Sequence, residues 1–250
     1  MPPARILIIA GSDSGGGAGI QADIRTVTML GGHAMTAITA ITAQNTMGVQ
    51  QIHIVPAQMV LAQIDSVAAD IGIDAIKIGM IGSAATARAV AERLALLDPV
   101  PILFDPVMVA TSGGALADAE TIAAFEALLD LATLVTPNLP ELAALGGEQA
   151  VLAHGCALLV KGGHEAGDTL TDRLVAPDGS VTTWSGSRID TTSTHGTGCT
   201  LASAIATGLG QGLSLADSIG RARTYVRAAL RAAPGLGHGH GPMGVPRDVV

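Results

Sequence analysis

Short runs of apolar and β-branched residues recur along the chain and alternate with alanine-rich segments of helical spacing. Each apolar run has the length of a strand that is buried on both faces of a sheet. The predicted strands cover residues 6–10, 37–43, 75–78, 102–104, 134–136 and 158–160. The predicted helices cover residues 21–30, 56–69, 84–97, 119–129, 199–212 and 215–233. This alternation predicts an α/β fold in which helices cover both faces of a mainly parallel sheet.

The segment at residues 175–183 departs from this alternation. Pro177, Asp178 and Gly179 stand between two segments of alternating polarity, which is the pattern of a β-hairpin. We therefore expect an antiparallel edge and a mixed sheet. No linker or internal repeat divides the 250 residues, so we expect a single domain over residues 1–250 with a glycine- and histidine-rich tail at residues 235–250. Ligands in such folds bind at the carboxyl ends of the parallel strands.

The chain is acidic and poor in aromatic residues, which limits the partners it can bind. It has 13 Lys and Arg against 21 Asp and Glu, a net charge of −8, and aromatic residues make up only 2% of the chain. Nucleic acid is therefore not expected as a partner, because binding it depends on basic patches and stacking surfaces. The apolar run at residues 6–9 is too short for a signal peptide, and no run approaches the length of a membrane span. We expect a cytoplasmic protein without a disulfide framework, since only Cys156 and Cys199 are present.

Glycine is frequent, and one cluster of it occupies residues 11–19, between a predicted strand and a predicted helix. Counted from Gly15 and Gly17, the last position of a dinucleotide-binding fingerprint falls on Ile20, so that motif fails. A P-loop fails as well, because neither Lys77 nor Lys161 follows a glycine. Two interpretations remain open for this loop: a tight strand-to-helix turn, or a close approach of the backbone to a ligand.

A second glycine cluster, His195 to Thr200, precedes a long alanine-rich helix. Its amide groups would converge on the helix N-terminus, which attracts anions. A cysteine at that position should have a depressed pKa, so Cys199 is a candidate base or nucleophile. The alternative is a small, buried and inert cysteine. With His195 the pair also permits a cysteine-hydrolase interpretation, although their spacing is weak support for it.

Several charged or polar residues end predicted strands. A lysine in that position, Lys161, is expensive to bury unless an anion such as phosphate accompanies it. Asp105, Asn138 and Glu141 lie on the same side of the predicted sheet, and two carboxylates suit Mg²⁺. Asn138 and Glu141 could equally form a helix capping pair. The tail histidines, His238 and His240, are better explained as exposed than as metal ligands.

Seven motifs, in order along nearly the whole chain, resemble those of the hydroxymethylpyrimidine/phosphomethylpyrimidine kinases, which belong to the ribokinase-like superfamily. They lie at residues 10–23 (AGSDSGGGAGIQAD), 42–46 (TAQNT), 77–80 (KIGM), 105–108 (DPVM), 135–141 (VTPNLPE), 160–164 (VKGGH) and 194–201 (THGTGCTL). The terminal GHGHGP, residues 237–242, also resembles the family's sequence.

This resemblance implies a three-layer α/β/α sandwich, usually a homodimer. The implied activity is phosphorylation of 4-amino-5-hydroxymethyl-2-methylpyrimidine and then of its monophosphate, with ATP and Mg²⁺, in thiamine biosynthesis. By the same resemblance, Gln44 and Asp23 hydrogen-bond the aminopyrimidine. The loop at Gly11, together with Met80 and Val107, closes around its ring.

The resemblance also implies which residues hold the metal and the nucleotide. Asp105 and Glu141 would organise Mg²⁺ and its waters. Asn138 and Lys161 would bind the nucleotide phosphates, with Thr194 in the same nucleotide-binding set.

The remaining implied residues are those at the reacting centre. Gly196 and Gly198 would form an anion hole, and Cys199 stands where most ribokinase relatives carry an aspartate base. A thiol at that helix end is a plausible acceptor for the hydroxymethyl proton. Charge neutralisation and positioning nevertheless supply most of the catalysis in phosphoryl transfer.

Two departures from the family pattern concern the nucleotide side. The segment at residues 146–157 is shorter than in relatives, and Thr111 stands where many relatives have lysine. Two alternative functions remain: a pyridoxal or pyridoxine kinase of the same fold, against which Gln44 argues, and a non-catalytic sensor of pyrimidines or nucleotides. The sensor would need a damaged site, whereas Asp105, Glu141, Lys161 and Cys199 are all present.

Overall fold

A nine-stranded sheet forms the centre of the molecule. The structure is a computed structural model that describes residues 2–110, 113–162 and 167–246. Within these residues the strand order is β3-β2-β1-β4-β5-β6-β7-β8-β9. The strands are β1 (Arg5–Asp13), β2 (His33–Asn45), β3 (Gly48–Ile54), β4 (Ala75–Ile78), β5 (Ile102–Phe104), β6 (Leu134–Val135), β7 (Ala157–Val160), β8 (Thr169–Val175) and β9 (Val181–Ser187).

The sheet is parallel in its middle and antiparallel at both edges. Strands β2, β1, β4, β5, β6 and β7 run parallel. At one edge β8 and β9 form the predicted hairpin, whose turn is closed by the Gly179 N–H donating to the carbonyl of Ala176 at 2.9 Å. The predicted mixed sheet is therefore confirmed. Strand β3, antiparallel to β2, was not predicted, because Gln50, Gln51 and His53 interrupt any apolar run there.

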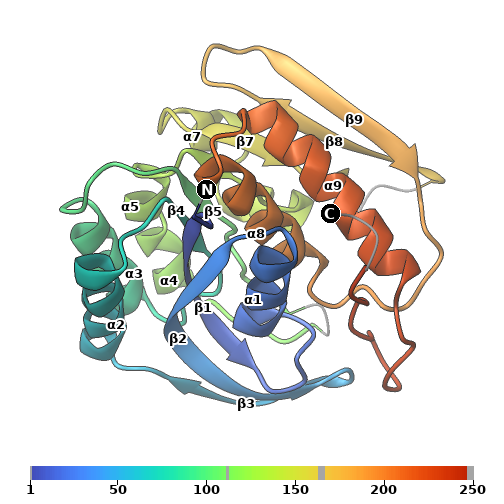
Figure 1. Cartoon of the computed structure of the whole chain (residues 1–250), viewed down its shortest axis with the longest axis horizontal. Helices are drawn as coiled ribbons and strands as arrows, with labels where there is room; N and C mark the ends of the chain where they lie inside the picture. Colours follow the sequence, from blue (N-terminus) through green and yellow to red (C-terminus); the bar gives the residue numbers. More distant parts are fainter. Residues whose placement is uncertain (1, 111–112, 163–166, 247–250) are drawn as a thin grey trace.

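Helices cover both faces of the sheet, so the predicted three-layer α/β/α architecture is confirmed. Side by side on one face lie α1 (Gly19–Met29), α8 (Thr197–Gly210) and α9 (Leu215–Arg231) (Figure 1). The other face carries α2 (Ala57–Asp70), α3 (Ala84–Leu94), α4 (Ala119–Ala124), α5 (Glu126–Leu129), α6 (Leu139–Ala144) and α7 (Glu148–Leu152). Strand β1 shows why both faces need cover: Ile6 and Ile8 pack into one apolar core, and Leu7 and Ile9 into the other.

One predicted helix, residues 119–129, is in fact two short helices that meet at Phe125. The ring of Phe125 is buried and packs edge-on against Phe104 of β5, with ring centroids 5.2 Å apart. The residues of both helices still contribute to the same apolar core. In the described part of the chain, no helix has both the length and the apolar character needed to cross a membrane.

The strand order reverses at β1, which lies between β2 and β4. In open α/β sheets a crevice for ligands forms outside the carboxyl ends of the strands at such a point. The residues that follow β1, β4, β5, β6 and β7 all lie at this edge of the sheet, together with the N-terminus of α8. These are the segments that carry the motifs found in the sequence.

Candidate active site

A cavity of about 940 Å³ opens at the carboxyl ends of the parallel strands. This volume is large enough for a nucleotide and a small acceptor together, since ligand pockets typically measure about 300–1,000 Å³. Most residues that the sequence analysis singled out line it: Gly11, Gln44, Met80, Asp105, Val107, Asn138, Glu141, Lys161, Thr194, Gly196, Gly198 and Cys199. Thr111 lies outside the described residues. The sequence motifs therefore meet in one place.

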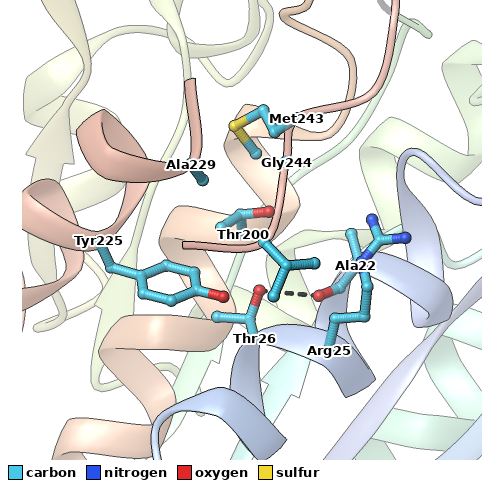
Figure 2. Close-up of a pocket in the computed structure, with 9 residues that line it drawn as sticks. Ala22, Arg25, Thr26, Thr200, Tyr225, Ala229, Met243 and Gly244 are labelled. Atoms are coloured by element: carbon cyan, nitrogen blue, oxygen red, sulfur yellow. Dashed lines mark hydrogen bonds between the residues drawn. The ribbon is translucent and has the colours of Figure 1, made fainter. Parts of the chain in front are cut away.

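A second, much smaller cavity lies between α1, α8 and α9. Figure 2 shows Tyr225, Thr26 and Thr200 around it, with Met243 from the C-terminal segment. Its volume of about 10 Å³ is that of a single water molecule. It cannot hold a pyrimidine or a nucleotide, so the large cavity is the candidate active site.

The N-terminus of α8 forms one wall of the large cavity. The helix begins after Gly196, whose φ of +83° is a left-handed conformation, and no side chain caps its free N–H groups. A β-carbon on Gly196 would overlap the carbonyl oxygen of Gly17, so the two glycine clusters pack directly on each other. A β-carbon on Gly198 would lie 3.5 Å from both Oδ2 of Asp105 and Nζ of Lys161. The helix end thus faces the charged residues with no side chain between them, as an anion site requires.

Lys161 and Asp105 form an ion pair in this cavity. Nζ of Lys161 donates to Oδ1 of Asp105 at 2.9 Å, and the hydroxyl of Thr136 donates to the same oxygen at 3.0 Å. Burial alone would lower the pKa of Lys161, but the charges of Asp105 and Glu141 outweigh it and raise the pKa. Lys161 is therefore a permanent cation. It lies in the cavity where the sequence predicted that an anion such as phosphate would accompany it.

Asn138 and Glu141 form the capping box that was left open as an alternative. Oδ1 of Asn138 accepts from the Glu141 N–H at 2.9 Å, and Oε2 of Glu141 accepts from the Asn138 N–H at 2.8 Å. Both residues nevertheless line the cavity. Burial raises the pKa of Glu141, while the charge of Lys161 opposes that rise. The capping role is thus confirmed, and it holds the Glu141 carboxyl near Lys161 and Asp105.

The carboxylates suit a hard divalent cation that brings most of its own ligands. Among the described residues, no three His, Cys, Asp or Glu side chains gather as a complete metal site. Asp105 and Glu141 supply two carboxyl groups in one cavity with Lys161. Mg²⁺ usually binds through one or two carboxylates, with water and substrate phosphates completing its shell. The donor set therefore fits Mg²⁺ bound together with a nucleotide.

Cys199, in the first turn of α8, corrects a prediction. The position of Cys199 at a helix N-terminus predicted a depressed pKa. Instead, burial raises the pKa of Cys199 to about 11, and the attraction of Lys77 only partly offsets this effect. Loss of hydration disfavours the thiolate more than the charge of Lys77 and the backbone hydrogen bond from Gly19 favour it. At neutral pH the resting side chain is a thiol, and the prediction of a depressed pKa is wrong.

Asp23 corrects a second prediction, that it hydrogen-bonds the pyrimidine directly. It is fully buried and does not line the cavity. Nζ of Lys77 donates to one carboxyl oxygen at 2.9 Å, and the hydroxyl of Ser203 donates to the other at 2.7 Å. Both oxygens are thus engaged behind the cavity wall. Asp23 instead balances the charge of Lys77, which does line the cavity.

A polar cluster around Gln44 was not predicted from the sequence. Asp13 ends β1, and its carboxylate accepts from the N–H groups of Gly15, Gly17 and Ala18 at 2.8–3.0 Å. Nε2 of His195 lies 2.9 Å from Oδ2 of Asp13 and 3.3 Å from Nε2 of Gln44. Because Nε2 of His195 is paired with Asp13, His195 does not serve as the base of a cysteine hydrolase. Asp13 and His195 both lie in motifs of the family resemblance, at residues 10–23 and 194–201, and this signal in the sequence could have identified the cluster.

The remaining predicted residues close the cavity from two sides. Gly11 leaves room for Met80, because a β-carbon there would lie 3.0 Å from the Met80 sulfur. Thr194 lies 3.1 Å, hydroxyl to Nδ1, from His240 of the C-terminal tail. The tail is also hydrogen-bonded to Thr46, because the backbone N–H of His240 donates to the Thr46 carbonyl at 3.0 Å. His238 and His240 are exposed, as expected, but this part of the tail is anchored beside the cavity.

Comparison with known proteins agrees with the motifs. Residues 13–244 match the phosphomethylpyrimidine kinase family. The hydroxymethylpyrimidine/phosphomethylpyrimidine kinase of Rhizobium meliloti is 46% identical over 254 residues, which cover 95% of each chain. The thiamine biosynthesis multifunctional protein of Corynebacterium efficiens is 44% identical over 258 residues, which cover 96% of this chain and 34% of the relative. The chain thus spans about a third of that longer relative.

Solved structures give the same fold. The Bacillus subtilis pyridoxal kinase in its ADP complex has a TM-score of 0.87 at 29% identity, with 97% of each chain covered. The phosphomethylpyrimidine kinase of Clostridium difficile has a TM-score of 0.78 at 34% identity, with 89% of this chain and 97% of that chain covered. Sequence identity is higher to the pyrimidine kinases than to the pyridoxal kinase. The chain belongs to the phosphomethylpyrimidine kinase family, whose fold is ribokinase-like.

Proposed function

We propose that this chain catalyses both phosphorylations named for its relatives, with ATP as the donor. The acceptors are 4-amino-5-hydroxymethyl-2-methylpyrimidine and then its monophosphate. One observation carries the proposal: Lys161, Asp105 and the uncapped end of α8 converge in one cavity with the carboxamide of Gln44. A fixed cation and a helix N-terminus stabilise phosphoryl groups, and Gln44 offers an amide to a heterocycle.

The two steps differ in the proton that must leave. In the first step the hydroxymethyl oxygen bonds to the γ-phosphorus of ATP, the bond from that phosphorus to the bridging oxygen breaks, and ADP departs. The hydroxyl proton must be released as well. In the second step the attacking oxygen belongs to a phosphate monoester, whose second pKa of about 6 leaves it unprotonated at pH 8. Only the first step therefore needs a proton acceptor.

Cys199 is the proposed acceptor in that first step. Its raised pKa keeps the thiolate fraction small at neutral pH. Positioning and neutralisation of charge then supply most of the rate, as phosphoryl transfer generally requires. Lys161 and the N–H groups of α8 bind the phosphoryl oxygens, and Gly196 and Gly198 allow that approach because they carry no side chain.

Asp105 and Glu141 would hold Mg²⁺, with water and phosphate oxygens as its other ligands. The bound ion supplies further neutralisation of the phosphate charge. Asn138 keeps the Glu141 carboxyl in place through the capping box. Lys161 holds Asp105 by the 2.9 Å contact and, like Thr194, lines the cavity. Both residues would bind the nucleotide.

A pyridoxal kinase is the second candidate, because the fold matches the Bacillus subtilis pyridoxal kinase closely. Both acceptors are heterocycles with a hydroxymethyl group, so the phosphate side of the cavity serves either. The carboxamide of Gln44 favours the aminopyrimidine, since it can donate to a ring nitrogen and accept from an amino group.

The experiment is a product assay with purified protein, ATP and Mg²⁺. We expect mono- and then diphosphate from the hydroxymethylpyrimidine and little product from pyridoxal. Absence of any pyrimidine phosphate would exclude the proposal, and efficient turnover of pyridoxal alone would establish the alternative. No product from either acceptor, with ligand binding retained, would support the sensor. The homodimer stays a prediction, to be checked by sedimentation velocity.

A further inference from the structure

The hydrogen-bond partners of Gln44 conflict in one of the two orientations of its carboxamide. A side-chain amide can turn by 180° with little change in shape, which exchanges a donor for an acceptor. With Nε2 of Gln44 facing Nε2 of His195, the two nitrogens lie 3.3 Å apart. On its other side, Oε1 of Gln44 lies 3.1 Å from the hydroxyl of Thr42. The positions of the hydrogens on His195 and on the Thr42 hydroxyl decide which orientation of the carboxamide is compatible with both contacts.

The proton on His195 is fixed by Asp13. Burial alone would raise the pKa of Asp13, but the hydrogen bonds from His195 and from the N–H groups of Ala18 and Gly15 outweigh it and lower the pKa. Asp13 is therefore a carboxylate at neutral pH and can only accept. Nε2 of His195, 2.9 Å away, must carry its hydrogen and direct it to Asp13. A nitrogen so used has no lone pair left for a second donor.

Thr42 leads to the same conclusion from the other side. Its hydroxyl has one hydrogen, and it lies 3.0 Å from the carbonyl oxygen of Ser12, which can only accept. When that hydrogen goes to Ser12, the hydroxyl offers Gln44 a lone pair rather than a donor. With Nε2 of Gln44 toward His195, a donor faces a donor there and an acceptor faces an acceptor at Thr42. Turning the carboxamide by 180° removes both mismatches.

We propose that Asp13, acting through His195, fixes the carboxamide of Gln44 and thereby sets which heterocycle the site accepts. In the fixed orientation Oε1 of Gln44 and the carboxylate of Asp13 share the one N–H of His195, and the amide nitrogen of Gln44 donates to Thr42. The backbone of Gln44 is held as well, because its N–H donates to Ser14 Oγ and its carbonyl accepts from the same hydroxyl, both at 2.8 Å. Asp13 and His195 are positioning residues.

The consequence is a defined pattern of one donor beside one acceptor in the cavity. A carboxamide in a fixed orientation binds a ring nitrogen with its N–H and an adjacent amino group with its oxygen. A 4-oxo pyrimidine presents the reverse pattern, a carbonyl beside a ring N–H, and meets donor with donor and acceptor with acceptor. The inference rests on the proposed function for the identity of the acceptor, and it adds the residues that enforce the choice.

The kinetic test compares His195→Leu with His195→Gln. The first removes the N–H, whereas the second can place an amide N–H near the same position. For His195→Leu we expect the KM of the aminopyrimidine to rise about ten- to hundredfold, as for loss of a hydrogen bond to a charged network, with the KM of ATP within about twofold. Discrimination against the 4-oxo analogue should fall by a similar factor. His195→Gln should recover most of both effects.

Several results separate this inference from a general structural role. His33→Leu, at the exposed start of β2, is the matched control and should change neither constant. Equal rises in both KM values for His195→Leu, or no recovery in His195→Gln, would overturn the inference. So would a ¹⁵N spectrum of the wild-type protein in which Nε2 of His195, assigned by its loss in the variant, lacks a proton. Failure of the wild-type enzyme to phosphorylate either pyrimidine would instead overturn the proposed function, and the spectrum would still decide the protonation of His195.

Discussion

The two lysines of this chain occupy matching places in the fold and have opposite surroundings. Lys77 is in β4 and Lys161 directly follows β7, and each pairs with an aspartate at 2.9 Å. The side chains of Lys77 and Asp23 are 0% exposed. Lys161 is 15% exposed and Asp105 3%, and both line the large cavity.

The difference lies in what each cation can still bind. Burial alone would lower the pKa of Lys77, but the charge of Asp23 and the more distant Cys199 and Asp105 raise it. Lys77 also lines the cavity, but its side chain is 0% exposed and its ammonium is paired with Asp23, which does not line it. Lys161 shares Oδ1 of Asp105 with Thr136 and keeps access to the cavity. The buried pair should therefore control stability, and the accessible pair should control the reaction.

The largest effect should follow from Lys161→Met. We expect kcat/KM to fall by roughly 10³- to 10⁴-fold, because a cation at the phosphoryl group contributes that much in related chemistry. The free energy of unfolding should fall less than in Lys77→Met, since Asp105 lines the cavity and water can reach it there, whereas Asp23 does not. Turnover is measured by ADP release and stability by urea unfolding. A loss of stability without a loss of rate would reverse our assignment of the two pairs.

Lys77→Met should have the opposite profile. Removing one partner of a buried ion pair leaves the other unpaired and costs about 3–5 kcal/mol. The double variant Lys77→Met/Asp23→Asn removes both charges, so it should recover at least about half of that loss. Urea unfolding of the three proteins checks this expectation. If the double variant is less stable than Lys77→Met, the unpaired carboxylate is not the source of the loss.

The fold was largely predictable because its central strands are continuous apolar runs. The exception, β3, lies at an edge, where Gln50, Gln51 and His53 show no such run. The cavity was predictable because strand ends meet at one edge of a parallel sheet. Pairings across long separations were not: Asp23 and Lys77 are 54 residues apart, and Asp13 and His195 are 182 apart. Nothing in the local sequence of Cys199 shows that burial raises its pKa.

Cys199 allows a third test, because it interacts with both lysines. If its thiolate accepts the hydroxyl proton, kcat/KM for the first phosphorylation should rise about tenfold per pH unit between pH 7 and 9, below the raised pKa of about 11. The second phosphorylation, with no proton to remove, should not show that rise. Cys199→Ser should abolish the slope. Unchanged first-step turnover in Cys199→Ser would refute the assignment of Cys199 as the base.

The smallest expected effect compares the influence of the two lysines on that thiol. Lys77 is the cation that most lowers the pKa of Cys199 from the level set by burial, so Lys77→Met should raise this pKa further, by about one unit or less. Lys161→Met should raise it less, because Lys161 is more exposed and already shared by Asp105 and Glu141.

The measurement is the pH dependence of alkylation of Cys199 by iodoacetamide, which reacts with the thiolate. A Cys156→Ala background removes the other thiol, and conditions below the unfolding transition of Lys77→Met keep the comparison in the folded state. A larger shift in Lys161→Met than in Lys77→Met would contradict the comparison between the two pairs. It would mean that the accessible lysine, rather than the buried one, sets the charge felt at the start of α8. The phosphate site and the proton acceptor would then depend on the same residue.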